Sequence, residues 1–241
     1  ALKQSVVGFK DLFIFLPESQ KKQLRDYRNQ RVNLTLIAKG PLDALNINKL
    51  FLKGLTRTAI DANGVLYGLP DAGKLRYDLN IAEMSSGLND IKPFLPASVQ
   101  KQVSIPAWFS ISGKINGTTT AYRPNLKIRT ADGDADINGA IDMSRSGKET
   151  YDLLLVTRGL NLGKILRMDS TLGRISMNGK VKGVGFDPKT MDATLDATIA
   201  EAFLNGYNYR DFSAKGYMKG KLGEIALTSR DPNAFMTMQA Y

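Results

Sequence analysis

The stretch RISMNGKVKG at residues 174–183 alternates apolar or small residues with polar ones, as Ile175 and Met177 illustrate. The stretch MDATLDATI at 191–199 repeats this alternation. A period of two predicts β-strands with one apolar and one polar face. The turn signal DPK, which begins at Asp187, separates the two stretches and favours an antiparallel pairing between them.

The same alternation recurs at residues 32–38, 74–81 and 134–143. Short turn signals separate the runs: NG at 63–64, 116–117 and 205–206, SG at 146–147, and DPN at 231–233. Strands of this length with turn signals between them predict an antiparallel meander. No segment has the strand, helix, strand order of a parallel βαβ sheet.

Many predicted strands carry a glycine in the middle, and glycine permits bulges and bends. These glycines are Gly54, Gly113, Gly139, Gly179, Gly183 and Gly216. A sheet with one apolar face and repeated bends either closes into a barrel or stays open as a trough. We predict a mainly β fold in which an elongated, curved antiparallel sheet forms an open apolar groove, a repeating β-groove or β-taco, with a few short helices.

A short motif occurs twice, as FLPESQKKQ at 15–23 and FLPASVQKQ at 94–102, with an offset of 94 − 15 = 79 residues. LNLGKILRM at 160–168 is a degraded third copy. Each copy predicts a short helix, and a fixed period favours a repeat protein. We therefore predict three repeat modules, at residues 1–87, 88–157 and 158–241.

The composition excludes several kinds of chemistry. The 241 residues include no cysteine and no histidine, so disulfides, thiolate metal sites and Ser-His or Cys-His triads are impossible within the chain. DGDADINGAIDM at 132–143 is similar to a calcium loop, but Ile137 and Met143 stand where the loop needs glycine and glutamate. We expect no catalytic residue, metal or cofactor, although an enzyme using carboxylates, lysine and tyrosine stays open.

The formal net charge of +10 suggests an anionic partner, either nucleic acid or anionic lipid. The basic residues are dispersed, and no base-stacking platform or groove-reading helix is recognisable, so we expect no nucleic-acid binding. We predict that the densest basic group faces water or touches acidic partners or phospholipid headgroups; it comprises Lys21, Lys22, Arg25, Arg28 and Arg31. The chain begins at Ala1, and we expect it to be a piece of a longer protein.

Residues 160–241 resemble the AsmA-like proteins, in particular the TamB-type translocation and assembly module proteins of Gram-negative envelopes. The resemblance rests on the LNLGKIL entry, GKVKGVGFDP, ATLDATI, the NGYNY hairpin and the closing DPN. It implies a non-enzymatic internal segment of a periplasmic protein that is anchored in the inner membrane. The family's apolar groove would carry or shield phospholipid acyl chains between the inner and outer membranes, in a role in outer-membrane biogenesis.

The expected partners are phospholipid or another acyl-chain ligand, adjoining segments of the same longer chain and outer-membrane barrel assembly proteins. The alternative function is a scaffold or chaperone that pairs its sheet edges with strands of outer-membrane β-barrel proteins. The same apolar residues would also suit the closed core of a barrel or sandwich. The predicted lining of the lipid groove comprises Leu75, Tyr77, Leu79, Ile81, Ile137, Ile141, Leu153, Leu155, Ile175, Met177, Val181, Leu195 and Ile199.

Overall fold

The computed structural model describes residues 2–8, 29–69, 71, 73–95, 100, 103–187, 189–220, 222–229 and 237–240. The motif at 15–23, with the short helix predicted there, and the DPN signal at 231–233 lie outside these residues, as does most of the motif at 94–102. The basic residues Lys21, Lys22, Arg25 and Arg28 also lie outside them, whereas Arg31 begins a strand.

The chain divides into two compact units, each treated separately below. Unit 1 comprises Ala1–Asn116 and Arg129–Ala131, and unit 2 comprises Gly117–Ile128 and Asp132–Tyr241. The module boundaries at 87 and 157 remain a prediction. The short helices begin at residues 88 and 162, close to the predicted starts of modules two and three.

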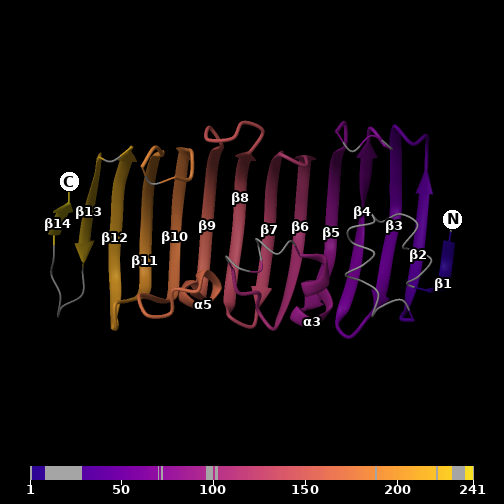
Figure 1. Cartoon of the computed structure of the whole chain (residues 1–241), viewed down its shortest axis with the longest axis horizontal. Helices are drawn as coiled ribbons and strands as arrows, with labels where there is room; N and C mark the ends of the chain where they lie inside the picture. The colour runs from indigo at the N-terminus through magenta and orange to yellow at the C-terminus, as the bar shows by residue number, and fades with distance from the viewer. Residues whose placement is uncertain are drawn as a thin grey trace. The chain divides into compact units, whose positions relative to one another are not determined.

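The described elements are strands and a few short helices (Figure 1). The first strands are β1 (Leu2–Gly8), β2 (Arg31–Lys39), β3 (Ala44–Gly54), β4 (Thr58–Tyr67) and β5 (Arg76–Gly87), followed by α3 (Leu88–Ile91) and the 3₁₀ helix η3 (Lys92–Phe94). Next come β6 (Trp108–Thr118), β7 (Ala121–Thr130), β8 (Gly133–Asp142), β9 (Thr150–Asn161) and α5 (Leu162–Leu166). The last strands are β10 (Leu172–Val184), β11 (Asp192–Leu204), β12 (Tyr207–Lys219), β13 (Leu222–Ser229) and β14 (Thr237–Ala240).

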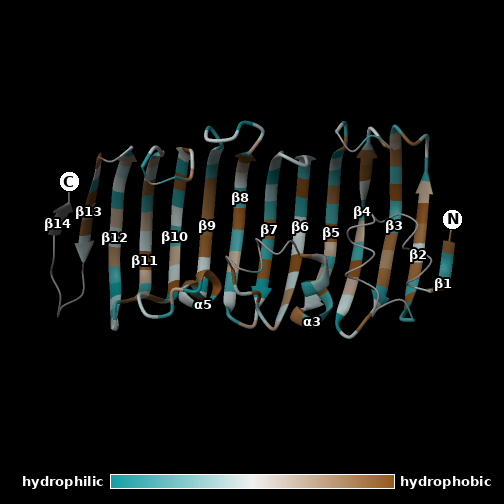
Figure 2. Ribbon diagram, viewed as in Figure 1, coloured by the Kyte–Doolittle hydropathy of each residue, from teal (hydrophilic) through white to brown (hydrophobic). Residues whose placement is uncertain are grey.

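The hydrogen-bonded order of the strands follows the chain from β1 to β14, which confirms the predicted meander. The sheet is antiparallel, curved and unclosed, so the mainly β prediction is confirmed. Figure 2 shows hydrophobic and hydrophilic residues interspersed along the strands. The alternation predicted at 32–38, 134–143, 174–183 and 191–199 falls within β2, β8, β10 and β11, apart from Met143 and Met191, which lie just beyond β8 and just before β11.

Bulges interrupt the ladders and help the sheet to bend. Between β9 and β10 the register shifts at Ile175 and Met177. There the Thr157 hydroxyl donates to the Ile175 carbonyl at 3.0 Å and accepts from the Met177 N–H at 3.1 Å. A side chain thus satisfies backbone groups that the shifted ladder leaves unmatched, and bulges of this kind increase local twist.

Two of the predicted NG turns are wrong. Gly64 lies inside β4 and Gly117 inside β6, with φ values of 145° and 138°. A Cβ at Gly64 would overlap the Asp78 carbonyl of the neighbouring strand, and one at Gly117 would overlap the Ala121 carbonyl. The dipeptide therefore supplies a strand residue with positive φ and no side chain, rather than a hairpin turn. The signal at 205–206 is a true turn between β11 and β12, with both residues at positive φ.

The predicted helix at 160–168 is confirmed over the five residues of α5. Asn161 precedes it, and its side-chain oxygen accepts from the Lys164 N–H at 3.0 Å, which is an N-cap. Arg167 ends the helix in the left-handed conformation, and the Met168 N–H donates to the Gly163 carbonyl at 2.7 Å.

Candidate functional site

One face of unit 2 collects apolar and small side chains from neighbouring strands. The cross-strand register aligns Ile137, Leu155, Gly179 and Ala197 in one row across β8 to β11. The next row runs through Leu153, Val181, Leu195, Gly216 and Ile225 across β9 to β13. Since a strand alternates its faces, both rows project from the same side of the sheet.

This apolar face is only partly covered. Among the described residues of unit 2, the buried hydrophobic side chains are mostly alanine: Ala135, Tyr151, Ala193, Ala197, Ile199, Ala202 and Ala214. The larger side chains of the face, such as Leu153, Val181 and Leu195, are only half-buried. All described strands belong to one sheet, so within the described residues no second sheet covers them.

The best-packed part of the face lies on β11 and β12. Ala197, Ile199, Ala202 and Ala214 form a buried cluster there. Partly buried hydrophobics pack against this cluster: Ile175, Met177, Leu195, Leu204, Phe212, Ile225 and Leu227. Ile199 is 7% exposed and belongs to a small core, whereas the half-buried Leu195 lies at its margin.

Beside this cluster the face is hollowed over a volume of about 520 Å³. The hollow lies where glycines interrupt the rows of larger side chains, at Gly216 between Leu195 and Ile225 and at Gly223. Its lining comprises Val181, Met191, Ala193, Thr194, Leu195, Gly216, Tyr217, Met218, Gly223, Glu224 and Ile225. Its side chains on the apolar side are valine, leucine, isoleucine, alanine and methionine, which suits an apolar ligand.

An aromatic pair stands next to the hollow. Tyr151 of β9 is 8% exposed and stacks on Phe186 of the β10–β11 loop, with ring centroids 5.1 Å apart and planes at 12°. Phe186 is 55% exposed. The same loop ends at Met191, which lines the hollow.

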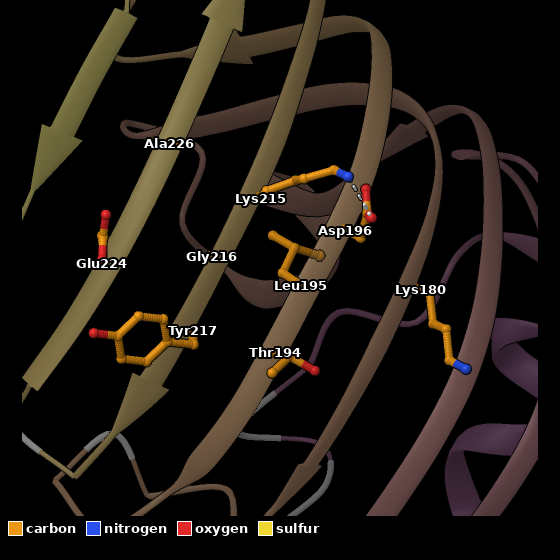
Figure 3. Close-up of a pocket in the computed structure, with 9 residues that line it drawn as sticks. All are labelled: Lys180, Thr194, Leu195, Asp196, Lys215, Gly216, Tyr217, Glu224 and Ala226. Atoms are coloured by element: carbon orange, nitrogen blue, oxygen red, sulfur yellow. Dashed lines mark ion pairs between the residues drawn. The ribbon is translucent and has the colours of Figure 1, made fainter.

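The opposite face of β9–β13 is polar and carries charges of both signs. Lys215 and Asp196 form an ion pair at 3.1 Å, drawn in Figure 3, and Lys180 pairs with Asp152 at 3.4 Å. Lys180, Asp196 and Lys215 line a second hollow of about 480 Å³. The residues that this hollow shares with the first are Thr194, Leu195, Gly216, Tyr217 and Glu224. Each of these lysine and aspartate side chains is more than 40% exposed, so the pairs contribute little stability.

The structure places the predicted lining residues in two separate sets. In unit 2, nine of them lie on β8 to β11: Ile137, Ile141, Leu153, Leu155, Ile175, Met177, Val181, Leu195 and Ile199. In unit 1, Tyr77, Leu79 and Ile81 lie on β5 and Leu75 just before it, all of them half-buried. Only Val181 and Leu195 line the 520 Å³ hollow, and the role of the thirteen residues as a groove lining remains a prediction.

The sequence pattern gives no sign of a role at this face for Tyr151, Phe186, Met191 or Met218. In that pattern Met191 is only one position of an alternating strand. Phe186 lies in a turn, and nothing in a sequence tells whether a turn residue folds back onto the sheet. The glycine at 216 was a usable signal, since a mid-strand glycine leaves a gap among larger neighbours.

The acids at 132–143 belong to β8 and the turn before it rather than to a cation-binding loop. Asp136 accepts a 2.8 Å hydrogen bond from Arg158, which raises the pKa of that arginine. Asp132 contacts Lys164 at 2.5 Å. The described residues contain no group of three or more acids, histidines or cysteines placed to hold a metal ion.

Within the described residues, no helix has the length and hydrophobicity needed to span a membrane. Comparisons with protein-family models, curated proteins and solved structures gave no match.

Proposed function

We propose that the apolar face of β9–β13 is part of a groove that holds phospholipid acyl chains. On this proposal the chain is a non-enzymatic segment of an AsmA-like, TamB-type protein. That protein would be anchored in the inner membrane and carry phospholipid through the periplasm to the outer membrane. The observation that carries the proposal is the half-buried apolar face with its 520 Å³ hollow.

The energetics favour this ligand class. Each methylene group removed from water stabilises a complex by about 0.8 kcal/mol, and no directional contact is required. A face of branched aliphatic side chains therefore suits chains of differing length. The polar face opposite carries paired charges and stays hydrated, so the two faces differ in what they can bind.

Site-specific photo-crosslinking tests the proposal. A photoreactive amino acid at Val181, which lines only the 520 Å³ hollow, should label co-purified phospholipid, whereas the same residue at Lys180, on the opposite face of the same strand, should not. Mass spectrometry of the labelled protein identifies the lipid. Equal labelling from both positions, or from neither, would contradict the groove.

A second pair of variants separates a groove wall from a closed core. Leu195→Asp should cost about 1 kcal/mol of folding free energy because the side chain is half-buried, and it should abolish lipid labelling at a second lining position. Ile199→Asp, in the buried cluster, should cost about 3 kcal/mol or more. Equally severe unfolding from both changes would favour the closed core.

The rival function, a scaffold for outer-membrane barrel strands, predicts a different result. Unfolded barrel peptides would then bind without lipid, and lipid would not compete with them. The proposed partners are phospholipid and adjoining segments of the longer chain, with outer-membrane barrel assembly proteins as the partners of the rival function. Nucleic acid is not among them.

A further inference from the structure

Tyr151 brings a polar atom onto the apolar face, at the margin of the hollow. Its cross-strand partner on β10 is Gly183, whose own partner on β11 is Ala193. A Cβ built on Gly183 would lie 2.5 Å from the Tyr151 hydroxyl oxygen and 2.7 Å from Cζ. The tyrosine ring and its hydroxyl therefore lie over Gly183, whose partner Ala193 lines the hollow.

The position of this hydroxyl is fixed by packing. Phe186 stacks on the ring, and Tyr151 is only 8% exposed. A larger residue at 183 would push the ring away, so the glycine and the stacked phenylalanine together hold the hydroxyl at the surface of the face.

The hydroxyl is a donor that the protein leaves without an acceptor. No hydrogen bond joins it to another residue within the described ranges, and it does not belong to the fully buried polar atoms that lack a partner, so water can reach it. Burial raises the pKa of Tyr151, and the negative charge of Asp192 raises it further, so the hydroxyl keeps its proton at neutral pH. On a largely apolar face, a ligand oxygen can replace water as the acceptor for this donor.

We propose that Tyr151 orients the acyl ligand by donating a hydrogen bond from its hydroxyl to the ester carbonyl oxygen. The chain would then extend over Val181 and Leu195 toward Ile225, along the hollow. This inference rests on the proposed function and adds to it the end of the lipid that the protein recognises.

The test compares two lipids that differ only at the carbonyl. Isothermal titration of the full chain would use 1-palmitoyl lysophosphatidylcholine, an ester, and its 1-O-hexadecyl ether analogue, which has no carbonyl. The wild type should bind the ester about three- to tenfold more tightly, as expected for one hydrogen bond. Tyr151→Phe keeps the stacked ring and should bind both lipids equally, with the ether affinity unchanged.

Tyr207→Phe is the matched control, because Tyr207 is 49% exposed at the β11–β12 turn. It should keep the wild-type ester preference. An ester preference that survives in Tyr151→Phe, or equal binding of the two lipids by the wild type, would overturn the role of Tyr151 while leaving the groove intact. Failure of the wild type to bind either lipid would overturn the groove itself.

Discussion

The two units use the same kind of junction, held by different chemistry. In each, a strand leads directly into a short helix, β5 into α3 in unit 1 and β9 into α5 in unit 2. In unit 1, α3 contacts the turn before β4, the strand that pairs with β5. In unit 2, α5 contacts the turn before β8, the strand that pairs with β9.

In unit 1 the contact is one buried carboxylate. Asp90 of α3 is 2% exposed. It accepts hydrogen bonds from the N–H groups of Thr56 and Arg57, the latter at 2.7 Å, and from the Thr58 hydroxyl at 2.9 Å. The carboxylate thus satisfies backbone donors of the β3–β4 turn, much as a cap satisfies a helix end.

In unit 2 the carboxylate lies in the turn and the cation on the helix. Lys164 of α5 contacts Asp132 at 2.5 Å, but the lysine side chain is 50% exposed. The Asn161 N–H also donates to the Asp132 carbonyl at 2.7 Å, and Gly163 lies against β10. The position of α3 therefore depends on a charged side chain, whereas the position of α5 depends on close packing of its backbone against β10.

The first prediction concerns Asp90→Ala, which should lower the free energy of unfolding by about 3 kcal/mol, because it leaves two backbone N–H groups without their acceptor. Urea unfolding followed by circular dichroism measures this. Asp78→Ala, at an exposed position of β5, is the control and should change stability by less than about 0.5 kcal/mol. Equal effects of the two changes would mean that α3 is held by something other than its carboxylate.

The same carboxylate predicts a dependence on pH. Burial raises the pKa of Asp90, but hydrogen bonds from Arg57, Thr58 and Thr56 outweigh it, so the folded pKa lies below the ordinary 3.8. The stabilisation is therefore complete above the unfolded pKa and is lost as pH falls through the folded one. The stability difference between wild type and Asp90→Asn should stay constant from pH 7 to about 5 and shrink below 3.8. A difference that persists unchanged to pH 2 would exclude the charge as its cause.

The next prediction replaces the glycine at each junction with alanine. A Cβ at Gly163 would overlap the Leu172 carbonyl oxygen, a backbone atom that cannot swing aside. Gly163→Ala should therefore cost about 1–3 kcal/mol, despite the better helix propensity of alanine. At Gly87, which precedes α3, a Cβ would lie 3.5 Å from its nearest neighbours, an ordinary contact. Gly87→Ala should be nearly neutral in thermal unfolding, and the reverse order of effects would contradict the comparison.

The sequence predicted what local pattern controls. The alternation in 174–183 and 191–199 identified β10 and β11, because each strand keeps one face toward apolar neighbours. The motif LNLGKILRM at 160–168 predicts α5, although not its cap at Asn161. The alternation also predicts that the glycines of β10 and β12 are strand residues, as the structure has them.

Local sequence patterns do not predict contacts between residues that lie far apart in the chain. The groups that bond to Asp90 lie more than 30 residues away in the chain, so the sequence gives no sign of them. Tyr151 fits the alternation of β9 as an apolar position, and its hydroxyl acquires meaning only once Gly183 lies beside it. The NG pairs at Gly64 and Gly117 mislead because a strand kink and a hairpin turn both require positive φ.

The smallest expected effect is that of the ion pair at α5. Lys164→Met keeps most of the aliphatic length and removes the charge, and it should cost less than about 1 kcal/mol, because water screens the half-exposed lysine. The wild type should lose this small advantage as salt rises from about 0.05 to 0.5 M, where the Debye length shortens. A double-mutant cycle with Asp132→Asn, in urea at both salt concentrations, isolates the pair from other contacts of the aspartate. A coupling energy as large as the effect of Asp90→Ala would show that charge holds both helices, and the difference between the two junctions would disappear.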